Sequence, residues 1–331
     1  MSLPDVFKNI QKPTPDQPVT PPEPRTPPPS PSAVRRINNI EAFKDTLQII
    51  KQDPLLSSRT ARSAQETVLI LPETFSEKTP VSKETNVHVQ EATTLQAARE
   101  LCGKYRRVAL LNFANPIEPG GGVWRGANAQ EESLCRAGTL YPCLTGNGAA
   151  GYYRDHQTLP RNGSAFWGSD RVLYSPGITF FKEEVPADPG SDTSALELRY
   201  TDDWFTADVI TCAAPFFPSR QAAAPWEKLH PVLVERIKNI LEAAIDHDVE
   251  ALVLGAFGCG AFNNPPMTVA EAFQFVLLQP RYLNAFDEIC FAIKPSDKTF
   301  CPNLSAFQLK FFAFPDASFF TEEGNTRRFF E

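Results

Sequence analysis

Hydrophobic residues follow two alternating patterns beyond residue 32 of this 331-residue chain. Apolar positions three and four residues apart predict amphipathic helices, whereas short runs that are apolar throughout predict strands buried on both faces. The predicted helices are 37–50, which Pro54 helps to end, 92–102, one beginning near Ala129, 226–247 and 268–278. The predicted strands are 68–71, 108–113, 172–181, 208–214, 251–257 and 289–293, with a solvent loop expected over 184–196. This alternation indicates a three-layer α/β/α sandwich, and we expect one domain over residues 33–331.

Proline is concentrated at the start of the chain, where eleven of the 31 prolines lie in the first 32 residues. Runs such as Pro27-Pro28-Pro29 favour extended polyproline II and offer almost nothing to bury. We therefore expect residues 1–32 to be a disordered tail. The weaker alternatives are a ligand for proline-recognition domains, or a substrate of proline-directed kinases at Thr26 and Ser30.

Composition excludes several classes of protein. A net charge of −7 argues against nucleic-acid binding through a basic surface, so direct DNA binding is not expected. No apolar run approaches the roughly 18 residues of a membrane span, and the N-terminus lacks the apolar stretch of a secretory signal. Seven scattered cysteines form no C-x-x-C pair and four histidines form no H-E-x-x-H pair, so neither a metal nor a cofactor is expected. These features predict an intracellular protein, cytoplasmic or nuclear.

A triple glycine, Gly120-Gly121-Gly122, follows the strand that ends near Phe113. Glycine allows positive φ and lets backbone N–H groups approach a ligand without obstruction. Because binding crevices lie at the carboxyl ends of such strands, a ligand loop is favoured over a plain flexible turn.

A second glycine loop, residues 255–266, follows another predicted strand and precedes a helix. Gly258 and Gly260 permit a nest of inward-pointing amides, which suits phosphate. The loop lacks the Gly-Lys-Ser/Thr of P-loop NTPases and the third glycine of G-x-G-x-x-G, so it fits neither established nucleotide motif. Two such loops at one sheet edge suit a ligand with a diphosphate in its middle.

Glu131 and Glu132 open the helix that follows the triple glycine. Taken alone, two acidic residues there merely complement the helix dipole, but beside a ligand loop they become candidates for chemistry. Adjacent helical residues diverge by about 100 degrees, so the two do not form the opposed pair of an ordinary glycosidase. We expect one to be the acid/base and the other to position a sugar. A helix N-terminus lowers a carboxyl pKa whereas a general acid needs a raised one, so burial would have to outweigh the dipole.

The spacing of Gly120-Gly121-Gly122 and Gln130-Glu131-Glu132 resembles the signature of poly(ADP-ribose) glycohydrolases. Further segments resemble the microbial-type branch of that family, found in bacteria and fungi, within the macrodomain superfamily: Asp45-Thr46-Leu47, 112–116, 174–177, 211–215 and 255–262. The likeness covers about residues 33–300 and leaves the proline-rich tail outside. It implies a macrodomain-like fold with a helical N-terminal extension over 33–105.

The resemblance also implies an activity, which is the hydrolysis of the ribose–ribose bonds of poly(ADP-ribose). Glu132 would protonate the glycosidic oxygen and then activate a water, while Glu131 would hydrogen-bond ribose hydroxyls. Asn115 would hold the same ribose, the 258–261 amides would bind the diphosphate, and Phe262 would orient the ribose. The full set of implied substrate-binding residues is Asn115, Gly121, Gly122, Val123, Gln130, Gly258, Cys259, Gly260, Ala261 and Phe262.

Members of this branch are mainly exo-acting and release free ADP-ribose without a metal. The implied partners are poly(ADP-ribose) or ADP-ribosylated proteins as substrate and ADP-ribose as product, in the setting of the DNA damage response. Two alternatives share the same pocket. One is a non-catalytic ADP-ribose reader, which needs no carboxylate beside the scissile bond, and the other is a mono-ADP-ribosyl-protein hydrolase.

Deletion of residues 1–32 is expected to leave this hydrolysis intact, because the segment lies outside the resemblance and has little to bury. Release of ADP-ribose from the polymer by the shortened and full chains is the measurement. A severalfold loss in the shortened chain would show that the segment contributes to catalysis.

Overall fold

The computed structural model describes residues 31–312 except 77, 81–83, 162–164, 187–195 and 295–299. Apart from Pro31 and Ser32, the predicted tail lies outside the described residues, as does most of the predicted loop at 184–196. The strands are β1 (Val68–Ile70), β2 (Asn86–Gln90), β3 (Val108–Phe113), β4 (Val172–Pro186), β5 (Leu196–Cys212), β6 (Ala251–Leu254) and β7 (Glu288–Ala292). The helices are α1 (Pro31–Gln52), α2 (Pro54–Glu66), α3 (Thr94–Cys102), α4 (Gln130–Ala137), α5 (Leu140–Leu144), α6 (Asn147–Thr158), α7 (Trp226–Asp246), α8 (Pro266–Leu277) and α9 (Pro302–Phe311). Short 3-10 turns are η1 (Pro72–Thr74), η2 (Val123–Arg125) and η3 (Arg220–Ala222).

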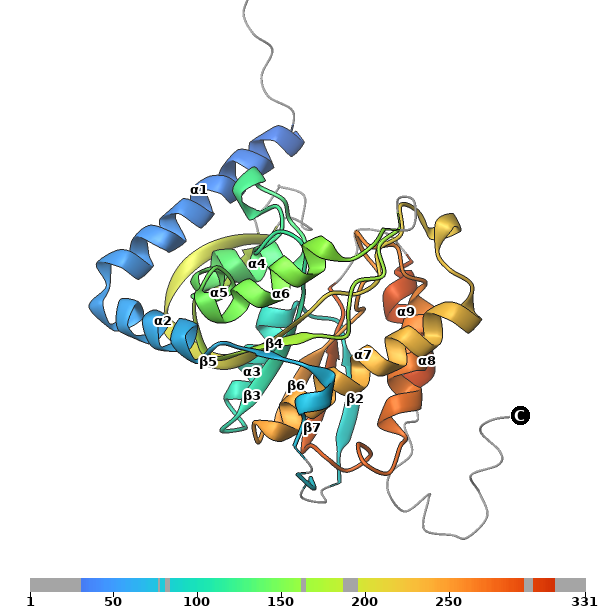
Figure 1. Cartoon of the computed structure of the whole chain (residues 1–331). Coiled ribbons are helices and arrows are strands. Elements are labelled where there is room, and N and C mark those ends of the chain that lie inside the picture. Colours follow the sequence, from blue (N-terminus) through green and yellow to red (C-terminus); the bar gives the residue numbers. More distant parts are fainter. Residues whose placement is uncertain are drawn as a thin grey trace, which may run out of the picture.

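The described strands form one mixed sheet in the order β1-β4-β5-β3-β6-β7-β2 (Figure 1). β3 lies at the centre and pairs in parallel with both β5 and β6, and β7 continues the parallel part to β2. β4 pairs antiparallel with β5 and with β1. The carboxyl ends of β3, β6 and β7 therefore meet at one edge of the sheet, which is where ligands bind in such folds.

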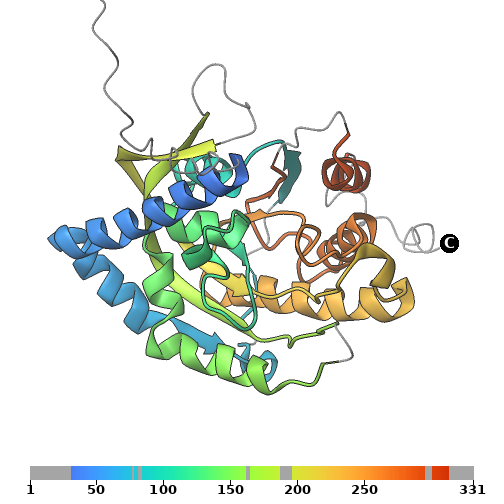
Figure 2. The same ribbon diagram turned by 90° about the horizontal axis from the view of Figure 1, so that it is seen from above.

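Helices cover both faces of the sheet, which confirms the predicted three-layer sandwich. Side chains alternate along β3: Ala109 and Leu111 pack into the core beneath α7, α8 and α9, whereas Val108 and Leu110 pack into the core beneath α3 to α6. Figure 2 shows α1 and α2 (blue) outside the layer that contains α4, with α7 to α9 (gold to red) on the other side. No helix in the described ranges is both long and apolar enough to cross a membrane.

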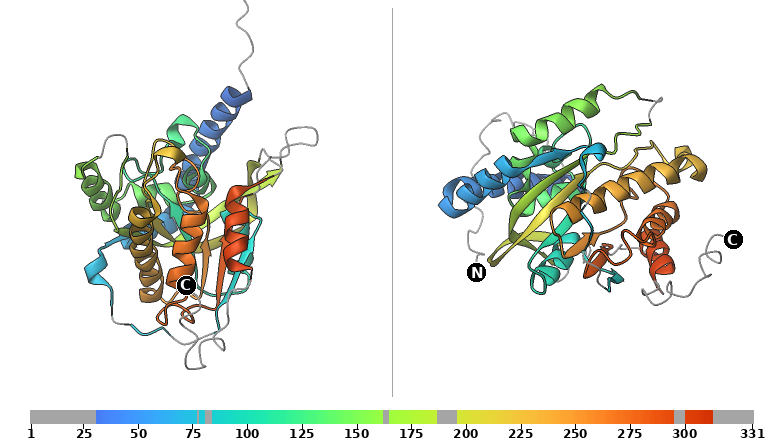
Figure 3. Two further views of the ribbon diagram at one scale, coloured as in Figure 1. Left: turned by 90° about the vertical axis from the view of Figure 1, so that its right-hand side faces the viewer. Right: turned by 60° about the horizontal axis from the view of Figure 1, so that its bottom comes forward.

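The strand predictions fail where strands are polar or half-exposed. β2 was not predicted, because Asn86-Val87-His88-Val89-Gln90 alternates with polar residues and is only partly buried. β5 begins at Leu196 rather than at residue 208, and β4 continues to Pro186. The loop expected over 184–196 is therefore wrong at residues 184–186 and 196, which belong to these strands. The two strands form a long hairpin of 15 and 17 residues (Figure 3). The sequence of its outer part is rich in polar residues, so a search for apolar runs does not find it.

α1 is longer than predicted and its apolar face is narrower. Phe43 and Ile50 are buried as expected, but Ile37 is 54% exposed. Pro54 does follow the end of α1, yet it also occupies the first turn of the unpredicted α2, where Asp53 caps the N–H groups of Leu55 and Leu56.

Phe43 anchors α1 to the segment that joins the triple glycine to α4. Its ring packs edge-on against Trp124 and Tyr141, with centroids 4.9 Å away in both cases. Nearby, Asn39 Nδ2 donates to the carbonyl of Gly126 at 3.1 Å. The N-terminal extension is thus packed into the core that lies beneath α3 to α6.

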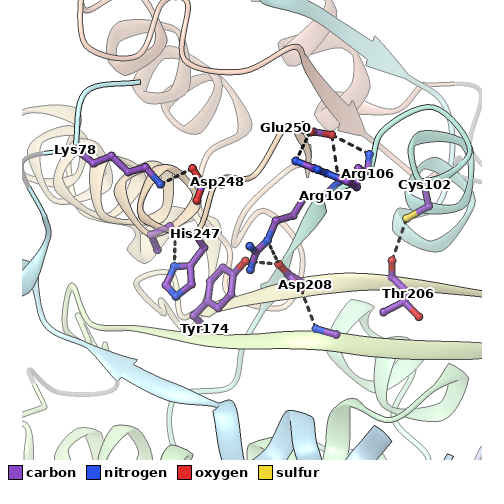
Figure 4. Close-up of polar contacts among 12 residues, drawn as sticks. Lys78, Cys102, Arg106, Arg107, Tyr174, Thr206, Asp208, His247, Asp248 and Glu250 are labelled. Atoms are coloured by element: carbon purple, nitrogen blue, oxygen red, sulfur yellow. Dashed lines mark hydrogen bonds and ion pairs between the residues drawn. The ribbon is translucent and has the colours of Figure 1, made fainter. Parts of the chain in front are cut away.

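The segment Tyr174-Ser175-Pro176-Gly177 forms a bulge in β4 that is held by Asp208 of β5 (Figure 4). The pairing shifts register between Ser175 and Ile178, where Gly177 adopts a φ of +66° and donates its N–H to Asp208 Oδ1 at 2.8 Å. The second carboxylate oxygen accepts from Arg107 Nε at 3.0 Å and from the Tyr174 hydroxyl. This motif therefore shapes the amino-terminal end of the central strands, opposite the edge with the glycine loops.

Phe43→Ala is expected to lower the free energy of unfolding by about 3–5 kcal/mol, since it removes a fully buried ring and leaves a cavity. Urea denaturation is the measurement, and Ile37→Ala on the exposed side of α1 is the matched control, with a change near zero. Equal effects of the two substitutions would contradict the packing of α1 through Phe43.

Candidate active site

A cavity of about 400 Å³ lies at the carboxyl ends of β3, β6 and β7. Its lining includes both predicted catalytic residues and half of the second glycine loop. Among the lining residues are Thr93, Thr94, Phe113, Asn115, Asn128, Glu131, Glu132, Ser133, Glu184, Phe257, Gly258, Gly260, Ala261, Phe262, Ile293, Lys294 and Asn303. A second cavity, of about 660 Å³, lies at the opposite edge near Asp208. The charged side chains there are paired with one another, as Lys78–Asp248, Arg106–Glu250 and Arg107–Asp208 (Figure 4).

Glu131 is almost fully buried at the start of α4, with 3% of its surface exposed. Its Oε2 accepts the N–H of Asn115 at 2.7 Å, and its Oε1 accepts from Asn112 Nδ2 at 3.3 Å. Asn115 also uses its Oδ1 to accept the N–H groups of Ile117 and Glu118 at 2.8 and 2.9 Å. Because the oxygen is occupied and the side chain lines the cavity, the amide Nδ2 of Asn115 is the group left for a ligand.

Burial raises the pKa of Glu131 to about 8, and the nearby charge of Glu132 adds to this rise. The hydrogen bonds from Asn115 and Asn112 favour the charged form and work in the opposite direction. For Glu131, burial therefore outweighs the donors at the helix start.

Glu132 is held by backbone donors from two sides and is 7% exposed. Its Oε1 accepts the N–H of Gly122 at 2.7 Å, and its Oε2 reaches back to the N–H of Ala129 at 3.0 Å. The second contact is half of a capping box; Ala129, the N-cap residue, has no polar side chain to complete it.

Gly121 cannot carry a side chain at this site. It adopts a φ of +58°, and a Cβ atom would lie 2.5 Å from Glu132 Oε1 and 3.0 Å from Glu131 Oε2. The triple glycine thus brings its backbone against the two carboxylates.

Residues 121–123 were predicted to contact a diphosphate, but their backbone N–H groups already donate to protein acceptors. The N–H groups of Gly121, Gly122 and Val123 donate to Glu118 O, Glu132 Oε1 and Gly120 O respectively. Val123 is also fully buried in the core. Any contact that these residues make with a ligand is therefore packing and does not use their N–H groups.

Gln130 connects α4 to the central strand. Its Oε1 accepts the N–H of Phe113 at 2.9 Å, and its Nε2 donates to the carbonyl of Leu111 at 2.7 Å and to Thr94 Oγ1 at 3.2 Å. Gln130 lines the cavity, but its amide is occupied by protein partners, so the geometry favours a role in orienting the two glutamates over a direct bond to substrate.

The second glycine loop presents three free amides to the cavity. Within the described part of the chain, the N–H groups of Gly258, Gly260 and Ala261 have no hydrogen-bond acceptor, whereas that of Cys259 donates to Ala256 O. Cys259 is 1% exposed and does not line the cavity. The predicted set 258–261 is thereby reduced to three candidate phosphate donors.

Asn264, which was not predicted, holds this loop in place. It is fully buried, and its Nδ2 donates to Pro215 O at 2.7 Å and to Gly258 O at 3.1 Å. Gly258 has a φ of +72°, and a Cβ there would lie 2.4 Å from Ala214 and 2.5 Å from the Asn264 amide. Phe262 lines the cavity at the end of the loop, with its ring edge-on to Phe216 at 5.6 Å.

Asn112 is a second site residue that was not predicted from the sequence. It is fully buried on β3, and it donates to Thr211 Oγ1 at 3.2 Å as well as to Glu131. One feature of the sequence could have identified Asn112, which is its polar amide in a strand that is otherwise apolar. No group of three or more His, Cys, Asp or Glu within the described ranges is arranged to hold a metal ion.

Comparison with known proteins identifies the family. The profile described as "Microbial-type PARG, catalytic domain", where PARG is poly(ADP-ribose) glycohydrolase, matches residues 42–183. Among solved structures, the poly(ADP-ribose) glycohydrolase of Thermomonospora curvata bound to the inhibitor ADP-HPD is 31% identical, with a TM-score of 0.67 over 82% of this chain and 98% of that chain. The enzyme of Deinococcus radiodurans in complex with ADP-ribose is 30% identical, with a TM-score of 0.64 over 77% and 97% of the two chains. No curated protein matches this chain.

The sandwich, the two glycine loops and the carboxylate pair at one sheet edge define a macrodomain-like protein with a candidate acid/base site. The chain belongs to the microbial-type poly(ADP-ribose) glycohydrolase family.

The raised pKa of Glu131 predicts a pH-dependent stability. The folded carboxyl titrates near pH 8 and the ordinary value is 4.5, so the folded state keeps a proton that the unfolded state releases between these values. This contribution to stability is fully present below pH 4.5 and is lost as the pH rises towards 8, by at most about 1.4 kcal/mol per pH unit.

Urea denaturation of the wild type and Glu131→Gln between pH 5 and 8.5 measures this effect. The variant is expected to lose less stability with rising pH than the wild type, and the exposed Glu235→Gln on α7 should keep the wild-type slope. Equal slopes for all three proteins would show that the pKa of Glu131 is not raised.

Proposed function

We propose that this protein hydrolyses the ribose–ribose glycosidic bonds of poly(ADP-ribose), with Glu132 as the acid/base and Glu131 as the residue that holds the ribose. The arrangement that supports this function is a single cavity lined by both glutamates, by Asn115 and by the free amides of the second glycine loop. Phosphate-binding amides and buried carboxylates in one cavity suit a substrate that carries a diphosphate beside a sugar.

The proposed reaction needs one group that first gives and then takes a proton. Glu132 protonates the leaving 2′-oxygen as the bond from that oxygen to the ribose C1″ breaks, which leaves an oxocarbenium-like ribose. A water then attacks C1″ and gives its proton to the Glu132 carboxylate, so the acid is regenerated. The bonds from Gly122 and Ala129 fix the orientation of the carboxyl group during both steps.

Glu131 is suited to hold hydroxyl groups. A carboxyl group whose pKa is about 8 is mostly protonated at neutral pH, so it can both donate and accept hydrogen bonds. The neighbouring Asn115 Nδ2 provides a further donor for the same ribose.

The proposed cleavage is mainly exo-acting and releases free ADP-ribose, as the family resemblance implies. A volume of about 400 Å³ lies in the range of pockets that enclose one nucleotide-sized ligand. The substrate would be the polymer or polymer attached to proteins, which places the protein in the reversal of ADP-ribosylation, including that of the DNA damage response. We also propose that the described part of residues 33–331 acts as one domain, with the extension over 33–105 packed into its core.

Glu132→Gln is expected to lower the kcat for ADP-ribose release from the polymer by roughly 10²-fold or more, the scale of general acid–base catalysis, while ADP-ribose binding remains. The amide keeps the size of the side chain but cannot donate and accept a proton in turn. Release of ADP-ribose is followed chromatographically, and ADP-ribose binding by calorimetry. Glu235→Gln, an exposed glutamate on α7, is the control and should match the wild type.

The outcomes separate the candidate functions. Tight ADP-ribose binding without turnover by the wild type would favour a reader, and turnover only of mono-ADP-ribosylated protein would favour a mono-ADP-ribosyl hydrolase. If Glu131→Gln abolishes release while Glu132→Gln retains it, the roles of the two glutamates are the reverse of those proposed.

A further inference from the structure

Arg136 is a buried cation in the last turn of α4, and its side chain reaches back to the start of that helix. It is 1% exposed, and its guanidinium group donates to Ala127 O at 2.6 Å, to Asn128 Oδ1 at 2.7 Å and to Ser133 Oγ at 3.2 Å. A basic residue in a last turn ordinarily complements the helix dipole, but these acceptors lie before and within the first turn. The dipole therefore does not account for the position of this guanidinium group.

The segment that Arg136 holds also carries the backbone donors of Glu132. Ala129 follows this segment and donates its N–H to Glu132 Oε2 at 3.0 Å. Ala127 donates its own N–H to Gly122 O at 3.1 Å, and Gly122 donates to Glu132 Oε1 at 2.7 Å. Gly122 and Ala127 are also in close contact, since a Cβ on Gly122 would lie 2.7 Å from that of Ala127. A displacement of this segment would therefore move both donors.

Electrostatics link the guanidinium group to Glu132 as well. Residues four apart lie on one face of a helix, so Glu132 and Arg136 share a face of α4. Burial lowers the pKa of Arg136, and the charge of Glu132 opposes this effect more than those of Cys135 and Glu184 do. The described hydrogen-bond acceptors of the guanidinium group are all neutral oxygens. Glu132 is therefore the carboxylate that does most to compensate this buried charge.

Other charges act on Glu132 or Arg136 from α4, η2 and β4. In the described part of the chain they belong to Glu131, Cys135, Arg125 and Glu184. Burial raises the pKa of the thiol among them, so it is neutral, and Arg125 is 67% exposed, so solvent screens its charge. The buried Lys182 of β4 is paired with Asp45 of α1 at 2.7 Å. The contacts of α1, α5 and β3 in this region use uncharged side chains, namely Asn39, Phe43, Thr46, Tyr141 and Asn112.

We propose that Arg136 is a positioning residue for Glu132, which fixes the segment that donates to the Glu132 carboxylate and supplies a positive charge beside it. This inference rests on the proposed function and specifies how its acid/base is held. When Glu132 gives its proton to the leaving oxygen, the carboxylate that forms is buried, and a nearby cation stabilises it. The proton returns from the attacking water, and the guanidinium group keeps its own protons throughout.

Arg136→Gln and Arg136→Lys separate the two contributions. Both disturb the three hydrogen bonds and are expected to lower the kcat for ADP-ribose release by roughly ten- to a hundredfold, the scale on which a small misplacement of a catalytic group acts. The affinity for ADP-ribose should change much less.

Only Arg136→Gln removes the positive charge, and this loss favours the protonated forms of the coupled pair Glu131 and Glu132. The alkaline limb of the pH profile of kcat, where the acid loses its proton, should therefore move up by about one pH unit in Arg136→Gln. In Arg136→Lys the limb should stay at the wild-type position, because the charge is kept.

Arg236→Gln is the matched control, because Arg236 on α7 is also 1% exposed and donates to Ala213 O at 2.8 Å and to Asp170 Oδ1 at 3.2 Å. It should lose comparable stability in urea and keep the wild-type limb. A wild-type kcat in both Arg136 variants, or an equal movement of the limb in Arg136→Gln and either Arg136→Lys or Arg236→Gln, would overturn the proposal. If Arg136→Gln does not fold, Arg136→Lys decides alone: a wild-type kcat overturns the proposal, and a lowered kcat with the affinity for ADP-ribose kept supports it.

The proposed function fails separately, if the wild type releases no ADP-ribose from the polymer. Titration of the Glu131 and Glu132 carboxyl groups by NMR then still tests the inference without turnover. These groups should titrate at higher pH in Arg136→Gln than in the wild type, and Arg136→Lys should match the wild type. Unchanged titration in Arg136→Gln would refute the electrostatic role of Arg136.

Discussion

The removal of two adjacent carboxyl groups from water is the constraint on which the site depends. Glu131 and Glu132 are 3% and 7% exposed at the start of α4, and burial raises the pKa of Glu131 to about 8. Such groups require donors, and here backbone N–H groups from the segment before α4 supply them, through Asn115 and Gly122. The approach of that backbone leaves no room for a Cβ at Gly121. The conformation of the triple glycine is therefore tied to the positions of the carboxylates.

A second set of contacts stabilises this arrangement from outside. α4 has eight residues and would be marginal in isolation, so it depends on packing against its neighbours. Gln130 binds it to β3 on one side. On the other side Thr46 of α1 donates to the carbonyl of Arg136, whose guanidinium group holds Asn128 and Ser133. Hydrogen bonds thus link the N-terminal extension to the helix that carries the glutamates and, through Arg136, to Asn128 and Ser133 of the cavity lining.

The accuracy of the sequence-based predictions follows the burial of each element. β3, β6 and β7 were found because strands buried on both faces are apolar throughout. β2 and the outer half of β5 were missed, since half-exposed strands tolerate polar residues. α2 was missed because Pro54 was interpreted as the end of the preceding helix. Proline is equally suited to the first turn of the next helix, which is where Pro54 lies. In the site, the glycine loops and the glutamates were identified from their spacing, whereas Asn112 and Asn264 were not, because each acts through a partner distant in sequence.

The sequence by itself determined the alternation of strands and helices, the two glycine loops, the glutamate pair and the family resemblance, because these are encoded in local spacing. Only the tertiary structure decided how the polar groups are paired. It occupies the N–H groups of Gly121, Gly122 and Val123, and it turns the amide of Cys259 away from the cavity. It also brings Glu184 of the β4–β5 hairpin into the cavity that contains Glu132. Burial and hydrogen bonding depend on residues that meet only in the folded chain, and so the pKa of Glu131 and the lining of the cavity could not be derived from the order of residues alone.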